Sequence, residues 1–476
     1  MNKYTVLAFD FGASSGRGIK AFFENGTLRY EEVHRFENNP IEKDGTLHWD
    51  IETLFHEVLV GIEKAGTFDS IGFDTWGVDF GLLDADGKLI DTPVHYRDIR
   101  TTGVPEAFCK AYGAEKLYQK TGSQIMNINT LFQLIALQKQ HPEQLQKAKT
   151  LLFMPDLFAY QLTGKASCEA TIASTGQILN PQTRIWDKDV LQAAGLSPEL
   201  FLPVISTGTV TGTWNGIKVI AVAGHDTQCA VAAVPTHASD AAFLSCGTWS
   251  LLGTELDAPI LTEESRKLAL SNEIGANGKI NYLKNIIGLW LIQESRREWK
   301  RQGTSYTYAD LEREALGAKA FQCFIDPDDP SFGVPGNLPA RVREYCEKTG
   351  QFVPETVGEV MRCIYESLAM KYRFAIEQLE TVTGKKFAKL HILGGGAKDR
   401  LLCQMTANSC DIPVTAGPVE ATALGNIIIQ LVALGALKDI DAGRELMLQN
   451  EKLLTYEPTT ASVWAEAYQT YRKLLN

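Results

Sequence analysis

Residues 5–23 read TVLAFDFGASSGRGIKAFF, and residues 241–253 read AAFLSCGTWSLLG. In each stretch an apolar run ends in a turn rich in glycine and hydroxyl side chains, and a second apolar run follows. Two strands joined by such a turn predict a β-hairpin whose main-chain N–H groups a ligand can approach closely. Because this pattern occurs in both halves of the chain, we expect two structurally related parts.

Apparent strands alternate with amphipathic helical patterns along the rest of the chain. Strands are predicted at residues 70–74, 219–223 and 390–393, and helices at residues 51–64, 129–139, 357–382 and 421–434. This alternation predicts α/β layering. A chain of 476 residues is too long for a single hydrophobic core. We therefore expect two lobes, residues 1–238 and 239–476, divided near a Pro, His and Ser cluster at 235–240.

Composition and charge disfavour several classes of function. Apolar residues make up 45% of the chain and charged residues 22%, as is typical of globular proteins. The net charge of −11, without a Lys or Arg cluster, disfavours nucleic acid and anionic lipid as partners. The pattern of a secretion signal is missing, and so is an apolar run of the roughly 20 residues that span a membrane, so we expect a cytoplasmic protein. The nine cysteines contain no CxxC pair, and we interpret them as buried thiols rather than a disulfide framework or a zinc site.

The two glycine-and-hydroxyl turns are candidate phosphate-binding elements. The first combines Asp10, at a predicted strand end, with Ser14, Ser15 and Arg17. Backbone donors beside a carboxylate can hold a triphosphate and its magnesium ion, although a serine-rich turn can equally be only a turn. The second turn, residues 247–250, gains meaning only because it repeats the first. Farther along, three glycines at 394–396 follow a predicted strand and are either a main-chain approach to a nucleotide or a flexible loop.

Asp226 follows the predicted strand 219–223 in the segment AGHDT. A carboxylate at the exit of a central strand is well placed to face the crevice in which open α/β sheets bind ligands. The same residue could instead cap the helix that follows, and both roles can coexist.

A second cluster of chemically informative residues lies at 73–81, FDTWGVDFG, followed by YRD at 96–98. Aromatic faces with a few fixed polar groups suit a small polyhydroxylated ligand, and the alternative is a structural edge of the core. The tripeptide DFG occurs without the catalytic loop of protein kinases, and no Gly-Lys pair is followed by Ser or Thr. Protein-kinase and P-loop chemistry are therefore excluded.

Taken in order, eight segments resemble the successive signatures of the FGGY carbohydrate kinases, and most closely those of the rhamnulokinase branch. They are DFGASSGR, FDTWGVDF, YRDIR, GHDT, LSCGTWSL, LKNIIGLWLIQ, LHILGGG and GPVEATALGN. The resemblance spans nearly the whole chain. Many relatives have Gly-Thr where this chain has Ala13-Ser14.

The resemblance implies a two-lobed α/β fold of the actin-like ATPase (ribonuclease H-like) type, each lobe a mixed sheet with flanking helices, with ATP and sugar bound between the lobes. It implies an ATP-dependent sugar kinase that converts L-rhamnulose to L-rhamnulose 1-phosphate and ADP in deoxy-sugar catabolism, as a monomer or homodimer. L-fuculose, the C4 epimer of L-rhamnulose, remains open as an alternative or second substrate. A non-kinase ATPase of the same superfold is the competing class.

The resemblance also implies roles for individual residues. Asp226 would be the catalytic base, and Asp10 would act on Mg²⁺ through a bound water. The expected ATP-binding residues are Ala13, Ser14, Ser15, Gly16, Arg17, Thr248, Gln293 and Gly395, and the expected sugar-binding residues are Gly77, His225, Asp226, Thr227 and Asn285. Trp76, Asp79 and Arg97 are added to the sugar set because of their chemistry. No disulfide is carried over from relatives, because Cys403 lacks a second cysteine four residues on.

Overall fold

The computed structural model describes residues 3–475. Contacts divide the chain into two compact units, each built from three segments. The first unit comprises residues 1–237, 255–283 and 421–450, and the second comprises residues 238–254, 284–420 and 451–476. The predicted lobes, residues 1–238 and 239–476, are each continuous in sequence, whereas each unit combines several segments. The predicted boundary between the lobes stays a prediction.

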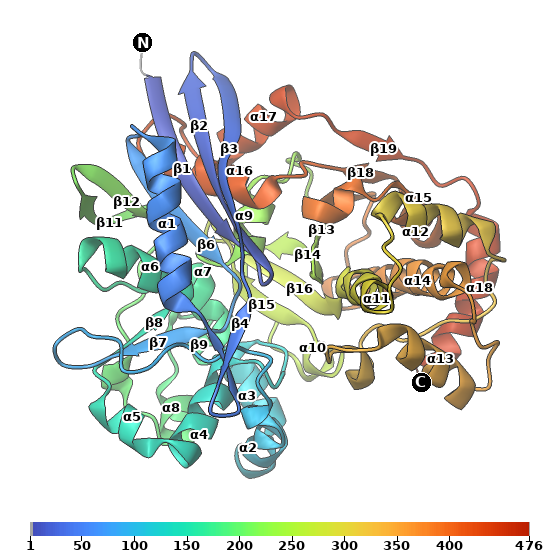
Figure 1. Cartoon of the computed structure of the whole chain (residues 1–476), viewed down its shortest axis with the longest axis horizontal. Coiled ribbons are helices and arrows are strands. Elements are labelled where there is room, and N and C mark those ends of the chain that lie inside the picture. Colours follow the sequence, from blue (N-terminus) through green and yellow to red (C-terminus); the bar gives the residue numbers. More distant parts are fainter. Residues whose placement is uncertain (1–2, 476) are drawn as a thin grey trace. The chain divides into compact units, whose positions relative to one another are not determined.

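The first unit is organised around a six-stranded mixed sheet of order β11-β12-β6-β1-β2-β3 (Figure 1). Its strands are β1 (Lys3–Phe11), β2 (Ser15–Glu24), β3 (Thr27–Glu37), β6 (Ser70–Thr75), β11 (Thr209–Trp214) and β12 (Ile217–Ala221). Strands β1, β6 and β12 are parallel neighbours, and β2 and β3 continue the sheet antiparallel. The predicted first hairpin is confirmed, and its turn is shorter than expected because Ser15 already belongs to β2.

Hydrogen bonds at the turn and a glycine in β2 fix this hairpin. The Gly12 N–H donates to Ser15 O at 2.9 Å, and the Asn38 side chain donates to Gly12 O at 2.9 Å, so the turn is held from inside and from the end of β3. A Cβ atom at Gly16 would lie 2.2 Å from the ring of Phe36. Only glycine allows β2 and the Phe36 ring to approach so closely.

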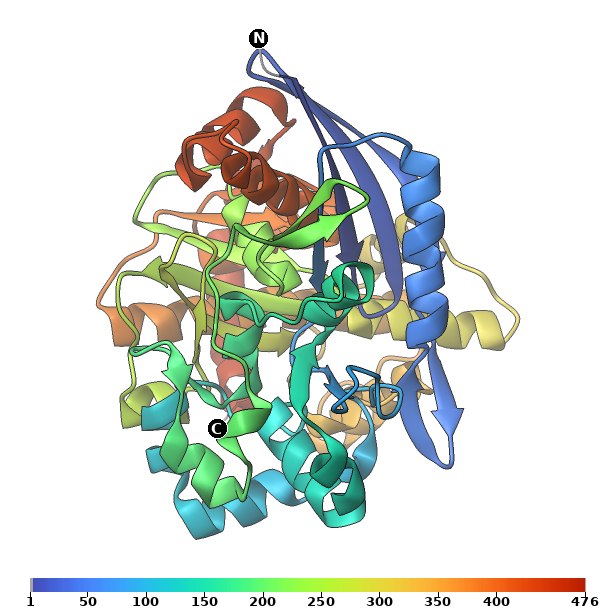
Figure 2. The same ribbon diagram turned by 90° about the vertical axis from the view of Figure 1, so that its left-hand side faces the viewer.

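Helices cover both faces of this sheet. Helix α1 (Ile51–Ala65) is capped at its N-terminus by Asp50, whose side chain accepts a hydrogen bond from Thr53 N, and it packs on the face that carries Phe9. Helices α9 (Asp226–Ala232) and α16 (Ala421–Ala433) pack together, and the Gln430 side chain donates to Leu7 O. In Figure 2 the blue helix α1 lies on one side of the blue strands, and the red helices of the same unit, α16 and α17 (Ile440–Asn450), lie on the other. The sheet is thus the middle layer of the first unit.

Most of the remaining elements of the first unit contribute to a second hydrophobic cluster. The strands are β4 (Pro40–Lys43), β5 (Thr46–Trp49), β7 (Phe80–Leu83), β8 (Thr150–Phe153), β9 (Leu179–Asn180), β10 (Ile185–Trp186) and β15 (Ser271–Ile274). The helices are α2 (Val104–Tyr112), α3 (Ala114–Thr121), α4 (Thr130–Gln140), α5 (Pro142–Lys147), α6 (Met154–Thr163), α7 (Ala170–Ala173), α8 (Lys188–Ala194), α10 (Glu263–Lys267) and α17 (Ile440–Asn450).

The second unit repeats the strand pattern of the first. Its strands belong to a seven-stranded sheet of order β15-β16-β14-β13-β17-β18-β19, of which β15 is counted with the first unit. The strands are β13 (Ala241–Cys246), β14 (Trp249–Leu256), β16 (Ile280–Ile287), β17 (Lys389–Leu393), β18 (Val414–Ala416) and β19 (Leu454–Tyr456), and the last residues of β14 and the first of β16 are counted with the first unit. The antiparallel hairpin β13–β14 adjoins the parallel strands β17 and β18, as β1–β2 adjoins β6 and β12. The predicted repeat is confirmed at the level of topology.

Helices also flank the second sheet. They are α11 (Trp290–Arg301), α12 (Tyr308–Gly317), α13 (Leu338–Lys348), α14 (Val357–Thr383), α15 (Arg400–Cys410) and α18 (Ala461–Leu474). The long α14 starts with a capping box between Thr356 and Glu359, which fixes its first turn. The four predicted helices are confirmed within one residue at each end, whereas the strand expected at 219–223 is Ile217–Ala221. Within residues 3–475, none of the helices combines the length and apolarity needed to cross a membrane.

Candidate active site

Three carboxylates lie at the ends of three adjacent strands of the first unit. Asp10 is near the end of β1, Asp74 is its register partner on β6, and Asp226 follows β12. The Thr75 N–H donates to Gly224 O at 2.8 Å, which ties the segment before Asp226 to the end of β6. Because parallel strands end at the same edge of a sheet, the sequence-distant carboxylates meet at the edge where α/β sheets bind ligands.

Arg17 and Asn426 stabilise this acidic edge. Arg17 Nη2 donates to Asp10 Oδ2 at 2.5 Å from the neighbouring strand, and Asn426 Nδ2 donates to Asp74 Oδ2 at 2.7 Å from α16. Burial raises the pKa of Asp74 well above its ordinary value, and the charge of Asp10 raises it further. Among the described residues, Asp74 Oδ1 has no hydrogen-bond partner although it is buried. A buried carboxylate oxygen without a partner, in an aspartate that interacts electrostatically with Asp10 and Asp226, fits a hard cation such as Mg²⁺, which prefers oxygen ligands.

Asp226 is the first residue of α9, and His225, not Asp226, occupies the N-cap position. The alternative that Asp226 is the N-cap is therefore wrong by one residue. Its Oδ1 accepts from Thr227 N at 2.6 Å and from Thr227 Oγ1 at 3.3 Å, and its side chain is 31% exposed. Burial raises the pKa of Asp226 to about 6, where positively charged His225 lowers it and Asp10 raises it. Such a carboxylate is ionised at pH 7 and still more basic than an ordinary aspartate, which suits a general base.

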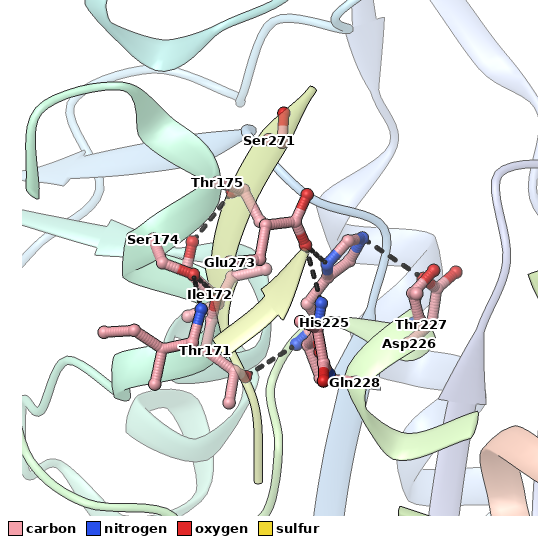
Figure 3. A network of polar contacts seen from close by, with 12 residues as sticks. Thr171, Ile172, Ser174, Thr175, His225, Asp226, Thr227, Gln228, Ser271 and Glu273 are labelled. Carbon is pink, nitrogen blue, oxygen red and sulfur yellow. Dashed lines mark hydrogen bonds and ion pairs between the residues drawn. The ribbon is translucent and has the colours of Figure 1, made fainter. Parts of the chain in front are cut away.

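His225 lies between two carboxylates (Figure 3). Its Nδ1 is 2.9 Å from Glu273 Oε2, and its Nε2 is 3.4 Å from Asp226 Oδ1. Gln228 Nε2 donates to the same Glu273 oxygen at 2.6 Å. Burial lowers the pKa of His225, but Glu273, Asp226 and Glu169 outweigh that effect and raise it overall.

The loop before Asp226 is fixed by a buried glutamate. Glu169 Oε2 accepts from Gly224 N at 3.0 Å and from Thr171 Oγ1 at 2.6 Å, and the His225 N–H donates to Thr171 Oγ1 at 3.3 Å. These bonds position the main chain of the AGHDT segment before α9 begins. The direction of the His225 and Asp226 side chains is consequently set by the surrounding fold.

The aromatic cluster holds Asp79 in its interior. Both oxygens of Asp79 accept hydrogen bonds from protein donors: Trp49 Nε1 at 2.6 Å, Trp76 Nε1 at 3.0 Å, Tyr96 N at 3.1 Å and Gln133 Nε2 at 2.8 Å. Trp76 and Asp79 are both buried. This arrangement favours the structural alternative for Asp79, and sugar contacts by Trp76 and Asp79 stay predictions.

Gly77 and Arg97 are more accessible than their neighbours. Both are half-buried, and the Arg97 guanidinium lies over the Tyr96 ring at 5.3 Å. Val78 has φ of 69°, a left-handed conformation that is strained for a β-branched residue, and Thr175 Oγ1 accepts its N–H at 3.0 Å. Strained main chain is concentrated at ligand sites, so this loop is a candidate part of the sugar site.

The predicted phosphate residues of the first unit lie beside the carboxylates. Ala13 and Ser15 are half-buried, Ser14 is exposed, and Gly16 is buried against Phe36. Arg17, directly opposite Asp10 in the hairpin, is the only cation of the turn at residues 12–17.

In the second unit, two of the four predicted residues, Thr248 and Gln293, are in contact. Thr248 Oγ1 donates to Gln293 Oε1 at 3.3 Å, and the main chain at Gly288 and Trp290 donates to Thr248 O. The glycine loop packs on the end of β13, because a Cβ atom at Gly396 would lie 2.2 Å from Cys246 Sγ. Gly395 is exposed, with open space where a Cβ atom would lie.

Asn285 is the fourth predicted residue of the second unit. It is half-buried on β16. Its contact with a sugar stays a prediction, as do the roles of the other site residues.

Within residues 3–475, three cysteines of the second unit form the one group of three or more His, Cys, Asp or Glu side chains whose ligand atoms all lie close enough together to hold one ion. The sulfur atoms of Cys323, Cys346 and Cys363 lie within 4.8 Å of one another, and all three residues are buried. Three sulfurs at this separation could ligate a soft metal ion, or pack as small apolar groups. Their spacing along the chain gave no sign of the cluster. All nine cysteines are free thiols, seven of them buried and two half-buried.

Sequence reasoning missed three residues of the acidic edge and its surroundings. Asp74 lies one residue before the end of its strand, as Asp10 does, and that signal could have identified it. Asn426 and Glu273 carry no comparable local signal. They reach the site only because α16 and β15 fold against it.

Comparisons with known proteins agree with this architecture. Residues 5–243 match the N-terminal domain, and residues 242–434 the C-terminal domain, of the FGGY family of carbohydrate kinases. The chain is 44% identical to the rhamnulokinase of Bacteroides thetaiotaomicron over 98% of each chain, and 44% identical to that of Enterococcus faecalis over 93% of this chain and 92% of the relative.

Solved structures show the same fold at low identity. The ligand-bound xylulose kinase of Lactobacillus acidophilus has a TM-score of 0.80 at 19% identity, with 99% of this chain and 97% of that chain covered. The glycerol kinase of Plasmodium falciparum with ADP has a TM-score of 0.77 at 15% identity, with the same coverage. The predicted α/β fold of the actin-like ATPase type is confirmed, and so is a phosphotransferase that uses ATP and a sugar. The chain belongs to the FGGY family of carbohydrate kinases.

Proposed function

We propose that this kinase transfers the γ-phosphoryl group of ATP to O1 of L-rhamnulose and releases L-rhamnulose 1-phosphate and ADP. The geometric observation that carries the proposal is Asp226, a carboxylate with a pKa of about 6 at the edge where β1, β6 and β12 end. The choice of sugar rests on the relatives named rhamnulokinase, which are 40–44% identical over nearly the full length.

The reaction needs a nucleophilic hydroxyl, an in-line phosphorus and charge neutralisation. Asp226 accepts the proton of the C1 hydroxyl as the O1–P bond forms and the bond between phosphorus and the bridging oxygen of ADP breaks. His225 and Thr227, the neighbours of Asp226, orient the sugar together with Gly77 and Asn285. Trp76, Asp79 and Arg97 are proposed as further contributors to the sugar pocket, with Asp79 acting through the aromatic side chains it binds.

The nucleotide is proposed to bind through both glycine-and-hydroxyl turns. Ala13, Ser14, Ser15, Gly16 and Arg17 supply main-chain donors and a cation from the first unit, and Thr248, Gln293 and Gly395 contribute from the second. The open space at Gly395 supports close approach by a nucleotide.

Mg²⁺ is proposed as the companion of ATP, held by Asp10 through a bound water, with Asp74 nearby. When bound, the ion would neutralise charge on the phosphoryl oxygens. To test this binding without turnover, Mg²⁺ is added stepwise to the wild type and to Asp10→Asn in a calcium-free buffer. The intrinsic tryptophan fluorescence of each protein is recorded at every step. A response that is equal in both proteins would contradict the role of Asp10.

We further propose that the enzyme acts in the cytoplasm as a monomer or homodimer and does not bind nucleic acid. The net charge of −11 supports the last point, because an acidic protein repels phosphate backbones. Sedimentation in the presence and absence of ATP distinguishes monomer from dimer.

A coupled ADP-release assay tests the activity. Mg-ATP is supplied with L-rhamnulose, L-fuculose, L-xylulose, D-xylulose or glycerol, and a reaction without sugar is the control. We expect turnover to depend on L-rhamnulose. Equal turnover with L-fuculose would make the enzyme a dual deoxy-ketose kinase, and ADP release that ignores every sugar would refute the proposal.

A further inference from the structure

We propose that Glu273 is a positioning residue for phosphoryl transfer, which holds His225 as a cation and thereby fixes the direction and basicity of Asp226. This inference rests on the proposed role of Asp226 as the base. Figure 3 shows the three side chains in a row, with Glu273 on β15, His225 in the middle and Asp226 at the start of α9.

The two contacts of the imidazole ring define its charge. Nδ1 faces Glu273 Oε2 at 2.9 Å and Nε2 faces Asp226 Oδ1 at 3.4 Å, so an acceptor lies opposite each ring nitrogen. A neutral imidazole has only one N–H and would turn a lone pair towards one of these carboxylates, whereas the cation donates a hydrogen bond to Glu273 and forms an ion pair with Asp226. The geometry is therefore that of an imidazolium between two carboxylates.

Burial makes the Glu273 carboxylate the deciding partner. The side chains of His225 and Glu273 are only 10% and 7% exposed. Burial by itself favours neutral histidine, and the carboxylates of Glu273, Asp226 and Glu169 together overcome it and raise the pKa of His225. Glu273 has the shorter contact of the two carboxylates bound to the ring, so its charge contributes most to keeping the ring protonated.

Glu273 is itself held in place from neighbouring elements. Gln228 of α9 donates to Glu273 Oε2 at 2.6 Å, and the Gln228 side-chain oxygen accepts from Asn281, which is the register partner of Glu273 on β16. The next residue, Ile274, donates its N–H to Ser174 Oγ at 3.0 Å. A carboxylate fixed at this many points restricts the imidazole, and the imidazole in turn restricts Asp226.

The charges around Asp226 show what this cation does. Asp10 raises the pKa of Asp226 and His225 lowers it, while the Thr227 main chain and hydroxyl also lower it. Asp74 on β6 and Arg17 on β2 lie on the neighbouring strands, and Arg17 is paired with Asp10. If His225 lost its proton, the positive charge that lowers the pKa of Asp226 would be gone, while the negative charge of Asp10 would remain. The pKa of Asp226 would therefore rise.

Glu273→Gln tests this role, because the amide oxygen can still accept the bonds from His225 and Gln228 while the negative charge is lost. The matched control is Glu57→Gln, which neutralises another glutamate that contacts a histidine. Glu57 lies on α1, and its Oε2 is 2.5 Å from Nε2 of His34 on β3. Both variants are measured as full-length enzyme with Mg-ATP and L-rhamnulose from pH 5 to pH 9.

We expect Glu273→Gln to move the acid limb of kcat/KM upwards by about one pH unit, the lower end of the effect of a neighbouring charge. Compared with the wild type at the same pH, kcat/KM of Glu273→Gln is then roughly tenfold lower below pH 6 and about twofold lower at pH 7, while KM for ATP stays unchanged. Glu57→Gln should leave the profile as it is. Glu273→Asp, which keeps the charge on a shorter side chain, should restore part of the original profile.

A second readout does not depend on turnover. Labelling the eight histidines with ¹⁵N reports the charge of each ring by NMR, and the His225 signal is assigned by its loss in His225→Gln. We expect His225 to be charged at pH 7 in the wild type and to lose its proton at lower pH in Glu273→Gln.

The two readouts separate the possible failures. A neutral His225 in the wild type at pH 7 would overturn the proposal even if Glu273→Gln fails to fold. A uniform loss of kcat with an unchanged pH profile and an unchanged His225 signal would also overturn it, because Glu273 would then be merely structural. Absence of sugar-dependent ADP release in the wild type would count against the proposed function, while the NMR result would still decide the charge of His225.

Discussion

Replacing Asp226 with asparagine should abolish most of the activity while leaving the fold intact. Asn retains an oxygen that can accept the hydrogen bonds of Thr227 N and Oγ1, now at 2.6 Å and 3.3 Å. It cannot take the proton of the attacking hydroxyl. Because a general base contributes typically about 10²–10⁴-fold, we expect kcat to fall by a factor in that range, with little change in KM for ATP.

The same substitution should increase stability at neutral pH. The pKa of Asp226 is about 6 in the folded protein against an ordinary value of 3.8, so folding disfavours the charged form. Each pKa unit corresponds to about 1.4 kcal/mol, which gives an upper limit of about 3 kcal/mol for the cost of this charge. The side chain is 31% exposed, and solvent screening reduces the expected gain to about 1–2 kcal/mol.

The pH dependence of this gain has a definite sign. A group whose pKa is raised by folding contributes its full stability below the unfolded pKa and loses it as the pH rises through the folded pKa. For Asp226 that window runs from 3.8 to about 6. The advantage of Asp226→Asn should therefore be constant above the window and shrink to about a third of its pH 7 value at pH 4.5.

Thermal unfolding at pH 7 and pH 4.5, combined with the ADP-release assay, measures both effects. Asp189→Asn is the control, because Asp189 is exposed and Lys120 lowers its pKa, so neutralising it should not stabilise the protein. An Asp226→Asn protein less stable than the wild type at pH 7 would refute the reasoning on burial. A folded variant with turnover within tenfold of the wild type would refute the assignment of the base.

Three further predictions follow from the same structure. The acid limb of kcat/KM in the wild type should fall about tenfold per pH unit below the pKa of Asp226, which is about 6, and a limb centred near pH 4 would contradict this. Gly396→Ala should destabilise the protein by about 1–3 kcal/mol in urea unfolding, because its Cβ atom would lie 2.2 Å from Cys246 Sγ. Gly395→Ala has open space for its Cβ atom, so it should leave stability unchanged and raise KM for ATP. Equal stability of the two variants would count against this packing. Asp79→Asn should lower stability by about 1–3 kcal/mol, because the NH₂ group of the new side chain would face a buried hydrogen-bond donor. A large rise in KM for the sugar at unchanged stability would instead support direct sugar contact.

Local patterns were sufficient for much of the fold. The hairpins, the helices α1, α4, α14 and α16 and the occurrence of the hairpin pattern in both halves of the chain follow from apolar runs, turn residues and helical periodicity, all of which act over neighbouring residues. Strand ends were less certain, since β12 ends two residues before the predicted strand does. The start of α9 also differed from the capping alternative, because main-chain bonds to Glu169 and Thr171 position His225 ahead of it.

The sequence by itself determined the chemistry available to this protein: two glycine-and-hydroxyl turns, a carboxylate after a strand and an aromatic cluster. Only the tertiary structure decided which groups act together. Asp10 and Asp74 meet because β1 and β6 are parallel neighbours, and Glu273 reaches His225 because β15 packs beside α9, 48 residues along the chain. Such pairings depend on burial and on long-range strand order, neither of which a local pattern of residues encodes.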